Sequence, residues 1–258
     1  MTYGVSYEKE FPKDSHIEAS EGGLFYPLGG QPKLFNPIHV TNQIRKEDNM
    51  VKIKEMPYSE KYAMVVDNTK FDESFLFPFV QKHLGDQAVS ELKGIIQSGF
   101  KPIPEEASFK EKYEVAYGNW IWGVKNIFRF IRRQMGEDGF KKFERADVEA
   151  LIKKNATSAL IFLKIIRLFS PSTAFTMTAK QMGYKFQWLT PFSVPELTRD
   201  KAVLDIPRCK ILDFPDSEDI CVVGCQSTYP KWVAEQFKVS MKWNRQGNSC
   251  TGILTPLS

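Results

Sequence analysis

The chain has 258 residues, of which 42% are hydrophobic, and this is enough for one sizeable core or for a domain with an extension. Its 35 basic and 31 acidic residues leave a net charge of +4, a small excess that argues against a nucleic-acid partner. The N-terminus lacks a basic region followed by an apolar run, and the longest apolar run, Ala159–Phe169, contains Lys164 and Arg167. We therefore expect no secretory signal, no membrane partner and a cytoplasmic protein with reduced cysteines.

The first 60 residues are predicted to form an irregular arm ahead of a single domain at residues 61–258. Glycine and proline recur too often in the arm for a long helix, whereas its aromatic residues indicate that it packs against another surface. That surface is either its own domain or a second subunit. At the start of the domain, the apolar residues within Tyr62–Val66 favour a short strand.

The spacing of apolar residues indicates helices from about residue 72 to residue 183. In Phe75–Gln97 the helical pattern is interrupted by Gly85 and Asp86, which predicts two short helices that meet near Leu84. The next helix is expected at about Ser108–Met135.

A turn at Gly136 is expected to precede a longer helix at about Phe140–Phe169. The last part of that helix, from Leu160, is apolar on almost every side, which predicts that it is the central buried helix. Ser170 and Pro171 favour the start of a further helix, because serine caps a helix and proline fits its first position. We expect that helix to end at Gly183.

The helix at Ser108–Met135 carries both basic and aromatic candidates for a ligand site. Lys125, Arg129, Arg132 and Arg133 form a basic stripe, which is either a solvated face or an anion-binding rim for a carboxylate or phosphate. Trp120 belongs to an aromatic group that either lines a pocket or packs in the core. The candidate ligand-binding residues are therefore Trp120, Arg129 and Arg132.

After Gly183 the pattern changes to strands. Extended segments are predicted at Tyr184–Leu189, Ala202–Ile206 and Arg208–Leu212, a short helix at Pro230–Phe237, and a terminal hairpin from Val239–Trp243 and Cys250–Leu254. Helices followed by strands predict an α+β fold, with the N-terminal helices packed on a C-terminal antiparallel sheet.

Common catalytic motifs do not occur in the sequence. It contains no G-x-G-x-x-G, Walker A, G-x-S-x-G or H-E-x-x-H pattern. Its three histidines, His16, His39 and His83, are scattered, so a Cys-His pair requires the arm to fold back over the sheet.

All four cysteines lie in the last fifth of the chain, at Cys209, Cys221, Cys225 and Cys250, with gaps of 11, 3 and 24 residues. Four thiolates complete a tetrahedral shell for zinc, copper(I) or an iron–sulfur cluster, so the four are candidate ligands of a metal ion or cluster. Two alternatives stay open. The thiols pack as small hydrophobic groups, or a single thiol reacts, with Cys209 favoured because Arg208 and Lys210 flank it.

Several segments occur in the order seen in a known family. They are Leu84-Gly-Asp-Gln-Ala-Val, the Trp120 helix, Met177–Tyr184, Arg208-Cys209-Lys-Ile-Leu, Cys221-x3-Cys225 and Gly247-x2-Cys250-x-Gly-Ile. In these segments the chain resembles the 4-vinyl-reductase-like and L-2-amino-thiazoline-4-carboxylic acid hydrolase-like proteins. The resemblance implies an α+β domain that encloses a small-molecule cavity between helices and a curved sheet, and a homodimer. It also implies that the cysteines gather near the cavity, sometimes on a metal.

Two functions follow from these features. The first is an enzyme, hydrolase-like or lyase-like, that acts on a small heterocyclic or thio-substituted acid, with the thiol site or its metal activating water and the basic stripe holding the carboxylate. The second is a non-catalytic ligand-binding or sensing module with a structural four-cysteine metal site. A structural site uses all four thiolates, whereas a catalytic metal keeps one position open, so the number of cysteine ligands separates the two.

Overall fold

The computed structural model describes residues 51–154 and 158–257. Most of the predicted arm, with His16 and His39, lies outside the described residues. The helices are α1 (Tyr58–Leu84), α2 (Asp86–Ser98), α3 (Phe109–Lys154), α4 (Ser158–Phe169), α5 (Pro171–Lys185) and α6 (Tyr229–Phe237). The strands are β1 (Ser193–Leu197), β2 (Ala202–Ile206), β3 (Val239–Gln246) and β4 (Ser249–Pro256). Short 3-10 turns η1 (Phe186–Trp188) and η2 (Lys210–Asp213) and a π-helix η3 (Ile220–Thr228) complete the order.

The N-terminal helices follow the predicted break but not the predicted strand. Tyr62–Val66 belongs to α1, because Val65 lies on the same buried face as Leu76 and Val80 and the helical spacing extends back to it. The prediction of a strand there is wrong. The prediction that two helices meet near Leu84 is confirmed, because Gly85 adopts a φ of 84° that side chains avoid.

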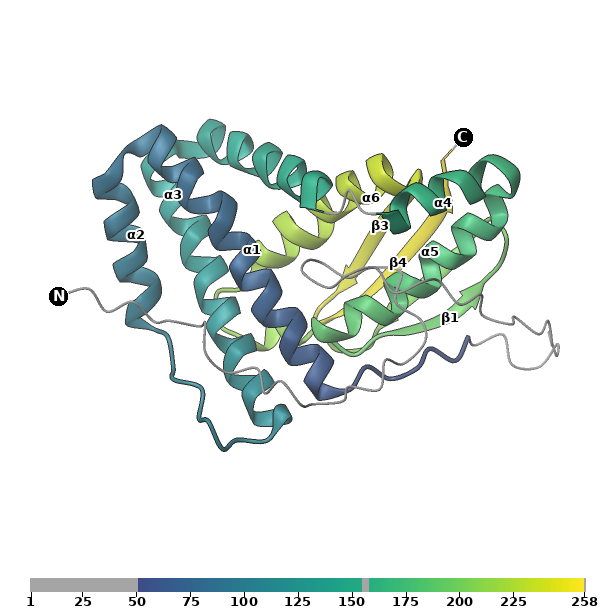
Figure 1. The fold of residues 1–258 in the computed structure, drawn as a ribbon, viewed down its shortest axis with the longest axis horizontal. Helices are drawn as coiled ribbons and strands as arrows, with labels where there is room; N and C mark the ends of the chain where they lie inside the picture. The colour runs from purple at the N-terminus through teal and green to yellow at the C-terminus, as the bar shows by residue number, and fades with distance from the viewer. Residues whose placement is uncertain (1–50, 155–157, 258) are drawn as a thin grey trace.

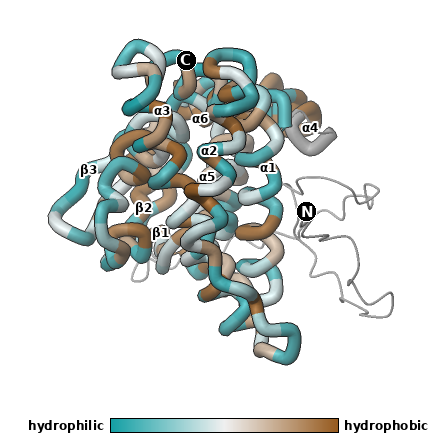
Figure 2. The backbone as a smooth tube through the Cα atoms, turned by 90° about the vertical axis from the view of Figure 1, so that its left-hand side faces the viewer, coloured by the Kyte–Doolittle hydropathy of each residue, from teal (hydrophilic) through white to brown (hydrophobic). Residues whose placement is uncertain are grey.

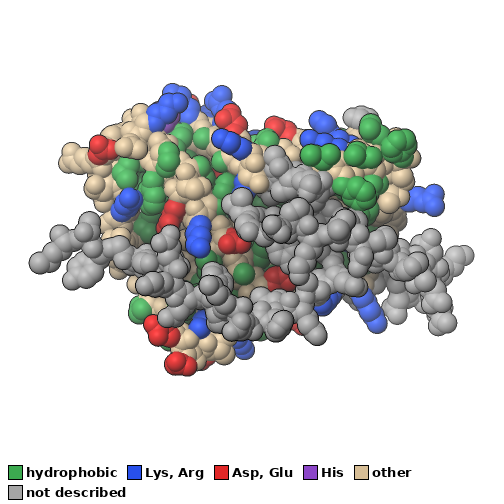
Figure 3. Space-filling model, in the orientation of Figure 1, with side chains coloured by type: hydrophobic (Ala, Val, Ile, Leu, Met, Phe, Trp, Pro, Cys, Tyr) green, Lys and Arg blue, Asp and Glu red, His purple; other side chains and the backbone are tan. Residues whose placement is uncertain are grey.

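The α3 segment is interrupted where the sequence predicts a turn, at Gly136, which has a φ of 65°. The helix after this turn ends at Lys154, and α4 is a separate helix. The prediction of a central buried helix at residues 160–169 is wrong, since Ile161, Leu168 and Phe169 are 62%, 80% and 84% exposed. Figure 3 shows hydrophobic side chains gathered at the upper right, where Figure 1 places α4.

The C-terminal strands form one antiparallel sheet with the order β1-β2-β4-β3. The predicted strand at Ala202–Ile206 and the terminal hairpin are confirmed, and so is the helix at Pro230–Phe237. The strand predicted at Tyr184–Leu189 is wrong, because these residues end α5 and form η1. The extended segment predicted at Arg208–Leu212 is also wrong, because most of it forms the turn η2. The sequence pattern missed β1, which also bridges to Val51.

The architecture is α+β, as predicted, with helices α1, α2 and α3 beside the sheet (Figure 1). One apolar core lies among α1, α2 and α3, and a second lies between the sheet and helices α5 and α6. Brown and teal segments alternate along the helices in Figure 2, as expected for helices with one buried face. No helix in the described ranges is long and apolar enough to cross a membrane.

Two buried tyrosines of α3 bind the turn that follows α5. Tyr113 donates a hydrogen bond to the carbonyl of Trp188 at 2.8 Å, and Tyr117 donates one to the carbonyl of Leu189 at 2.6 Å. A carbonyl buried without a partner costs about 1–3 kcal/mol, so these bonds hold residues 188–189 against α3. The two bonds thereby fix the position of α3 relative to the C-terminal half of the chain.

Candidate functional site

The four predicted metal-ligating cysteines come from separate elements that converge on one region. Cys209 precedes η2, Cys221 and Cys225 lie on η3, and Cys250 lies on β4. The Cys209 amide donates to the carbonyl of Asn248 at 2.6 Å, which ties it to the turn of the terminal hairpin. Burial raises the pKa of Cys225, and the charges that Cys221, Cys209 and Cys250 would carry as thiolates add to this effect.

The π-helix η3 is the unusual element of this region. Its backbone bonds reach five residues back, as when the Tyr229 amide bonds to the carbonyl of Gly224. π-helical turns are rare and occur often at functional sites. Here the wide turn carries Cys221, Cys225 and Thr228.

The thiols are held in their protonated form. Burial raises the pKa of all four, above all that of Cys225. Arg208 pairs with Asp213 at 3.0 Å and Lys210 pairs with Glu114 at 2.6 Å, so neither activates Cys209 as the sequence suggested. The cation that lowers the pKa of Cys209 and Cys221 is Arg245, and its effect is smaller than that of burial. A reactive thiolate at Cys209 is therefore not favoured.

The arrangement of the thiols also bears on metal binding. Within residues 51–154 and 158–257, no group of three or more His, Cys, Asp or Glu side chains is positioned to hold a metal ion. A metal shared by Cys209, Cys221, Cys225 and Cys250 thus requires side-chain movement and loss of the thiol protons. Metal or cluster binding by these residues stays a prediction.

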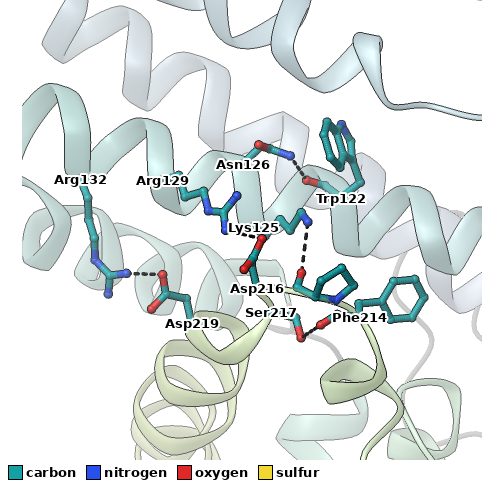
Figure 4. Close-up of polar contacts among 10 residues, drawn as sticks. Trp122, Lys125, Asn126, Arg129, Arg132, Phe214, Asp216, Ser217 and Asp219 are labelled. Carbon is teal, nitrogen blue, oxygen red and sulfur yellow. Dashed lines mark hydrogen bonds and ion pairs between the residues drawn. The ribbon is translucent and has the colours of Figure 1, made fainter.

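Three residues of the predicted basic stripe on α3 contact the segment that precedes η3 (Figure 4), whereas the fourth, Arg133, pairs with Glu91 of α2. Arg129 contacts Asp216 at 3.0 Å, and Arg132 bonds to Asp219 at 2.5 Å. The Lys125 ammonium donates to the carbonyl of Pro215 at 3.2 Å. These contacts hold the start of the π-helix against α3. Carboxylate binding by Arg129 and Arg132 stays a prediction, and such a ligand would compete with Asp216 and Asp219.

A cavity of about 70 Å³ lies between α1, α3 and η3. The described residues that line it come from helices and turns, and none of them belongs to a strand. A smaller cavity of about 20 Å³ lies toward the sheet, next to Trp243 and Ile206. Cys225 and Tyr229 line both cavities, so the cysteine cluster lies beside the larger one.

Two aspartates face the larger cavity, and neither was singled out from the sequence. Asp72 lies on α1 and Asp147 on α3, and both line the cavity among aromatic residues. Asp72 accepts a hydrogen bond of 2.9 Å from the indole N–H of Trp120, so this predicted ligand-binding residue lines the cavity and orients a carboxyl.

The protonation of this carboxyl pair is set by its surroundings. Burial raises the pKa of Asp72 to about 7, although the Trp120 hydrogen bond and Lys154 oppose the shift. Burial, together with the charges of Asp72 and Glu144, raises the pKa of Asp147 to about 8, although Lys154 opposes the shift. Two carboxyls that interact in this way titrate as a pair, so near neutral pH the pair holds at least one proton.

Two further polar side chains, those of Lys154 and Thr228, lie near the two aspartates. The Lys154 ammonium lies 4.1 Å from the centre of the Phe71 ring and is attracted by Asp72, Asp67 and Asp147, although burial lowers its pKa. Thr228 also lines the cavity, is 2% exposed, and its hydroxyl has no hydrogen-bond partner within the described part of the chain. Such an orphaned hydroxyl is uncommon in a native interior.

The sequence does carry a signal for Asp72 and Asp147, because each lies on the apolar face of its helix. Asp72 stands one turn before Leu76 and two turns before Val80, and Asp147 stands between Phe143 and Leu151 at the same spacing of four. An acidic residue on the apolar row of a helix must be buried with a partner or kept neutral.

No protein-family model, no curated protein and no solved structure matches this chain. The family resemblance stated from the sequence therefore stays a prediction.

The raised pKa of Asp147 leads us to predict how the free energy of unfolding changes with pH. The folded carboxyl keeps its proton up to about pH 8, whereas in the unfolded chain it ionises near its ordinary value of 3.8. The folded state then binds more protons between these values, so this group lowers stability as the pH rises. We expect Asp147→Asn to be more stable than the unchanged protein at pH 8 by about 1–3 kcal/mol, with a smaller difference at pH 4.

Urea unfolding at several pH values measures this effect. Asp138→Asn is the matched control, because Asp138 lies on the same helix with its side chain 96% exposed. A difference between Asp147→Asn and the unchanged protein that does not vary with pH would contradict the raised pKa.

Proposed function

We propose that the protein is a small-molecule-binding enzyme with hydrolase-like chemistry, whose substrate enters the cavity between α1, α3 and η3. The observation that carries this proposal is the pairing of Asp72 and Asp147 in that cavity. Carboxyls whose environments raise their pKa toward neutrality are suited to acid–base catalysis at physiological pH. The cysteine cluster adjoins the same cavity through Cys225, in keeping with the family resemblance.

The chemistry follows from the shared proton. A carboxyl that keeps its proton donates it to a leaving nitrogen or sulfur atom, while its ionised partner removes a proton from an attacking water. Asp72, oriented by Trp120 and with the lower pKa, is assigned as the base. Asp147, with the higher pKa, is assigned as the acid. The substrate class is a small heterocyclic or thio-substituted compound.

The wider setting is proposed from the sequence. A cytoplasmic location and a homodimer remain part of the proposal, and the ligand is a small molecule rather than a nucleic acid or a membrane. The sequence-based proposal that the substrate is an acid rests on Arg129 and Arg132, which pair with Asp216 and Asp219.

The enzymatic proposal predicts that either aspartate is needed for turnover. A panel of small thio-substituted and nitrogen heterocycles is incubated with the protein, and ring opening is followed by NMR. For a compound that is turned over, Asp72→Asn and Asp147→Asn should each lower kcat by about 10²–10⁴-fold, the usual contribution of a general acid or base.

Asp138→Asn should leave kcat unchanged, since its carboxyl is exposed on the surface. Turnover that persists within a factor of two in both cavity variants would remove the carboxyl pair from the mechanism.

A second candidate function is a non-catalytic ligand-binding or sensing module with a structural metal or iron–sulfur cluster on the cysteines. The observation that favours it is the convergence of Cys209, Cys221, Cys225 and Cys250 from three parts of the chain. When bound by four thiolates, a metal would tie η3 to the terminal hairpin and stabilise the fold.

Metal analysis and an absorption spectrum of anaerobically purified protein test this candidate. We expect about one metal ion or cluster per chain, lost in Cys221→Ser and Cys225→Ser and kept in Val222→Ala, which alters an exposed position of the same π-helix. A metal-free protein in which all four thiols react under native conditions would contradict the candidate.

A further inference from the structure

We propose that the cavity binds a small organic cation, an amidinium, guanidinium or ammonium group, between the carboxyls of Asp72 and Asp147, with the Thr228 hydroxyl as a further partner. This inference rests on the proposed function, because it names the charged group that the substrate places in the same cavity. The cationic group proposed here differs from the group expected from the sequence, where the basic stripe was predicted to bind a carboxylate of the substrate.

The charges around the cavity favour a cation. From α1, Asp72 faces the cavity and Asp67 lies near it; from α3, Asp147 faces the cavity. A single ammonium, that of Lys154, is attracted by all three carboxyls. A bound cation offsets the repulsion between the two cavity carboxyls, and a neutral or anionic ligand does not.

Other titratable groups packed around the pair do not reverse this balance. Glu144, which raises the pKa of Asp147, is 3.7 Å from Lys231 and so has its own cation. From η3 and α6, Cys225 and Tyr229 contribute groups whose pKa is raised by burial, so both are neutral near pH 7. From the side of α1, Lys70 acts on Asp67.

The walls of the cavity suit a planar cation. Phe75, Phe128, Phe143 and Trp120 line it, and the ring of Phe143 lies 5.8 Å from that of Phe75 and 6.0 Å from that of Phe128. Aromatic faces attract cations within about 6 Å of the ring centre. Lys154 already makes such a contact with Phe71 at 4.1 Å, which shows that this cluster of rings accepts a positive charge.

The Thr228 hydroxyl is an independent sign of a ligand. It is buried, lines the cavity and lacks a partner in the described ranges, although buried hydroxyls are normally satisfied. An N–H group held between the two carboxyls would have this oxygen as a further acceptor. Phenylalanine rings and leucine side chains on the other walls offer no such acceptor.

The volume limits what enters. About 70 Å³ is several times the roughly 10–15 Å³ that a cavity needs to hold one water molecule, so it admits a head group of a few heavy atoms.

Acetamidinium and acetamide form a matched pair of probes, because they share their shape and number of heavy atoms and differ in charge. We expect the full chain at pH 7.5 to bind acetamidinium at least tenfold more tightly than acetamide, as measured by NMR titration. Asp147→Asn and Asp72→Asn should each reduce that preference to less than threefold, and Asp138→Asn should retain it.

Equal affinity for the two probes, or a preference that survives in both cavity variants, would overturn the inference. Either variant suffices if the other fails to fold. The binding measurement needs no turnover, so it is separate from the enzymatic proposal. If the protein prefers the cation but hydrolyses no compound, it is a cation-binding module and the enzymatic proposal is wrong. If it hydrolyses a compound but shows no preference for the cation, the enzymatic proposal holds and the inference of a cationic substrate is wrong.

Discussion

The interior of the helical half is organised by two carboxyls that share one apolar cavity. Asp72 and Asp147 lie on helices that pack against each other, and the indole of Trp120 bonds to Asp72 at 2.9 Å. Burying a charged carboxylate is costly, so the pair holds its protons up to about pH 7 to 8. Loss of these protons at higher pH lowers the free energy of unfolding. Carboxyls whose pKa is raised in this way cluster at functional sites.

The cysteine cluster takes its place from the same arrangement. Arg129 and Arg132 hold Asp216 and Asp219 against α3, and the π-helix begins directly after them. Its wide turn then brings Cys225 to the wall of the cavity and Cys221 toward Arg245. The basic stripe, which looked like a ligand site in the sequence, thus positions the element that carries the thiols.

Periodicity in the sequence predicted the fold class, the break at Gly85 and the terminal hairpin, because each depends on local patterns that tertiary contacts did not override. It failed for α4, where an apolar helix is exposed, since periodicity reports how apolar a segment is and not what covers it. It failed at Tyr184–Leu189 because an alternating pattern of six residues also fits a helix end.

The candidate site was predictable in part. The cysteines could be singled out because they cluster in the sequence, and their shared site stays a prediction. The pairing of Asp72 with Asp147 joins residues 75 positions apart and needs the packing of α1 on α3. The π-helix could not be foreseen, because its hydrogen-bond pattern depends on neighbours fixed only in the fold.

Carbon-13 NMR of the aspartate side chains, followed from pH 4 to pH 10, tests the carboxyl pair most directly. Asp72 and Asp147 should titrate as a coupled pair with pKa values near 7 and 8, and Asp72→Asn should lower the pKa of Asp147 by removing the charge beside it. Two independent titrations near the ordinary aspartate value of about 4 would show that the carboxyls are neither buried together nor suited to acid–base chemistry.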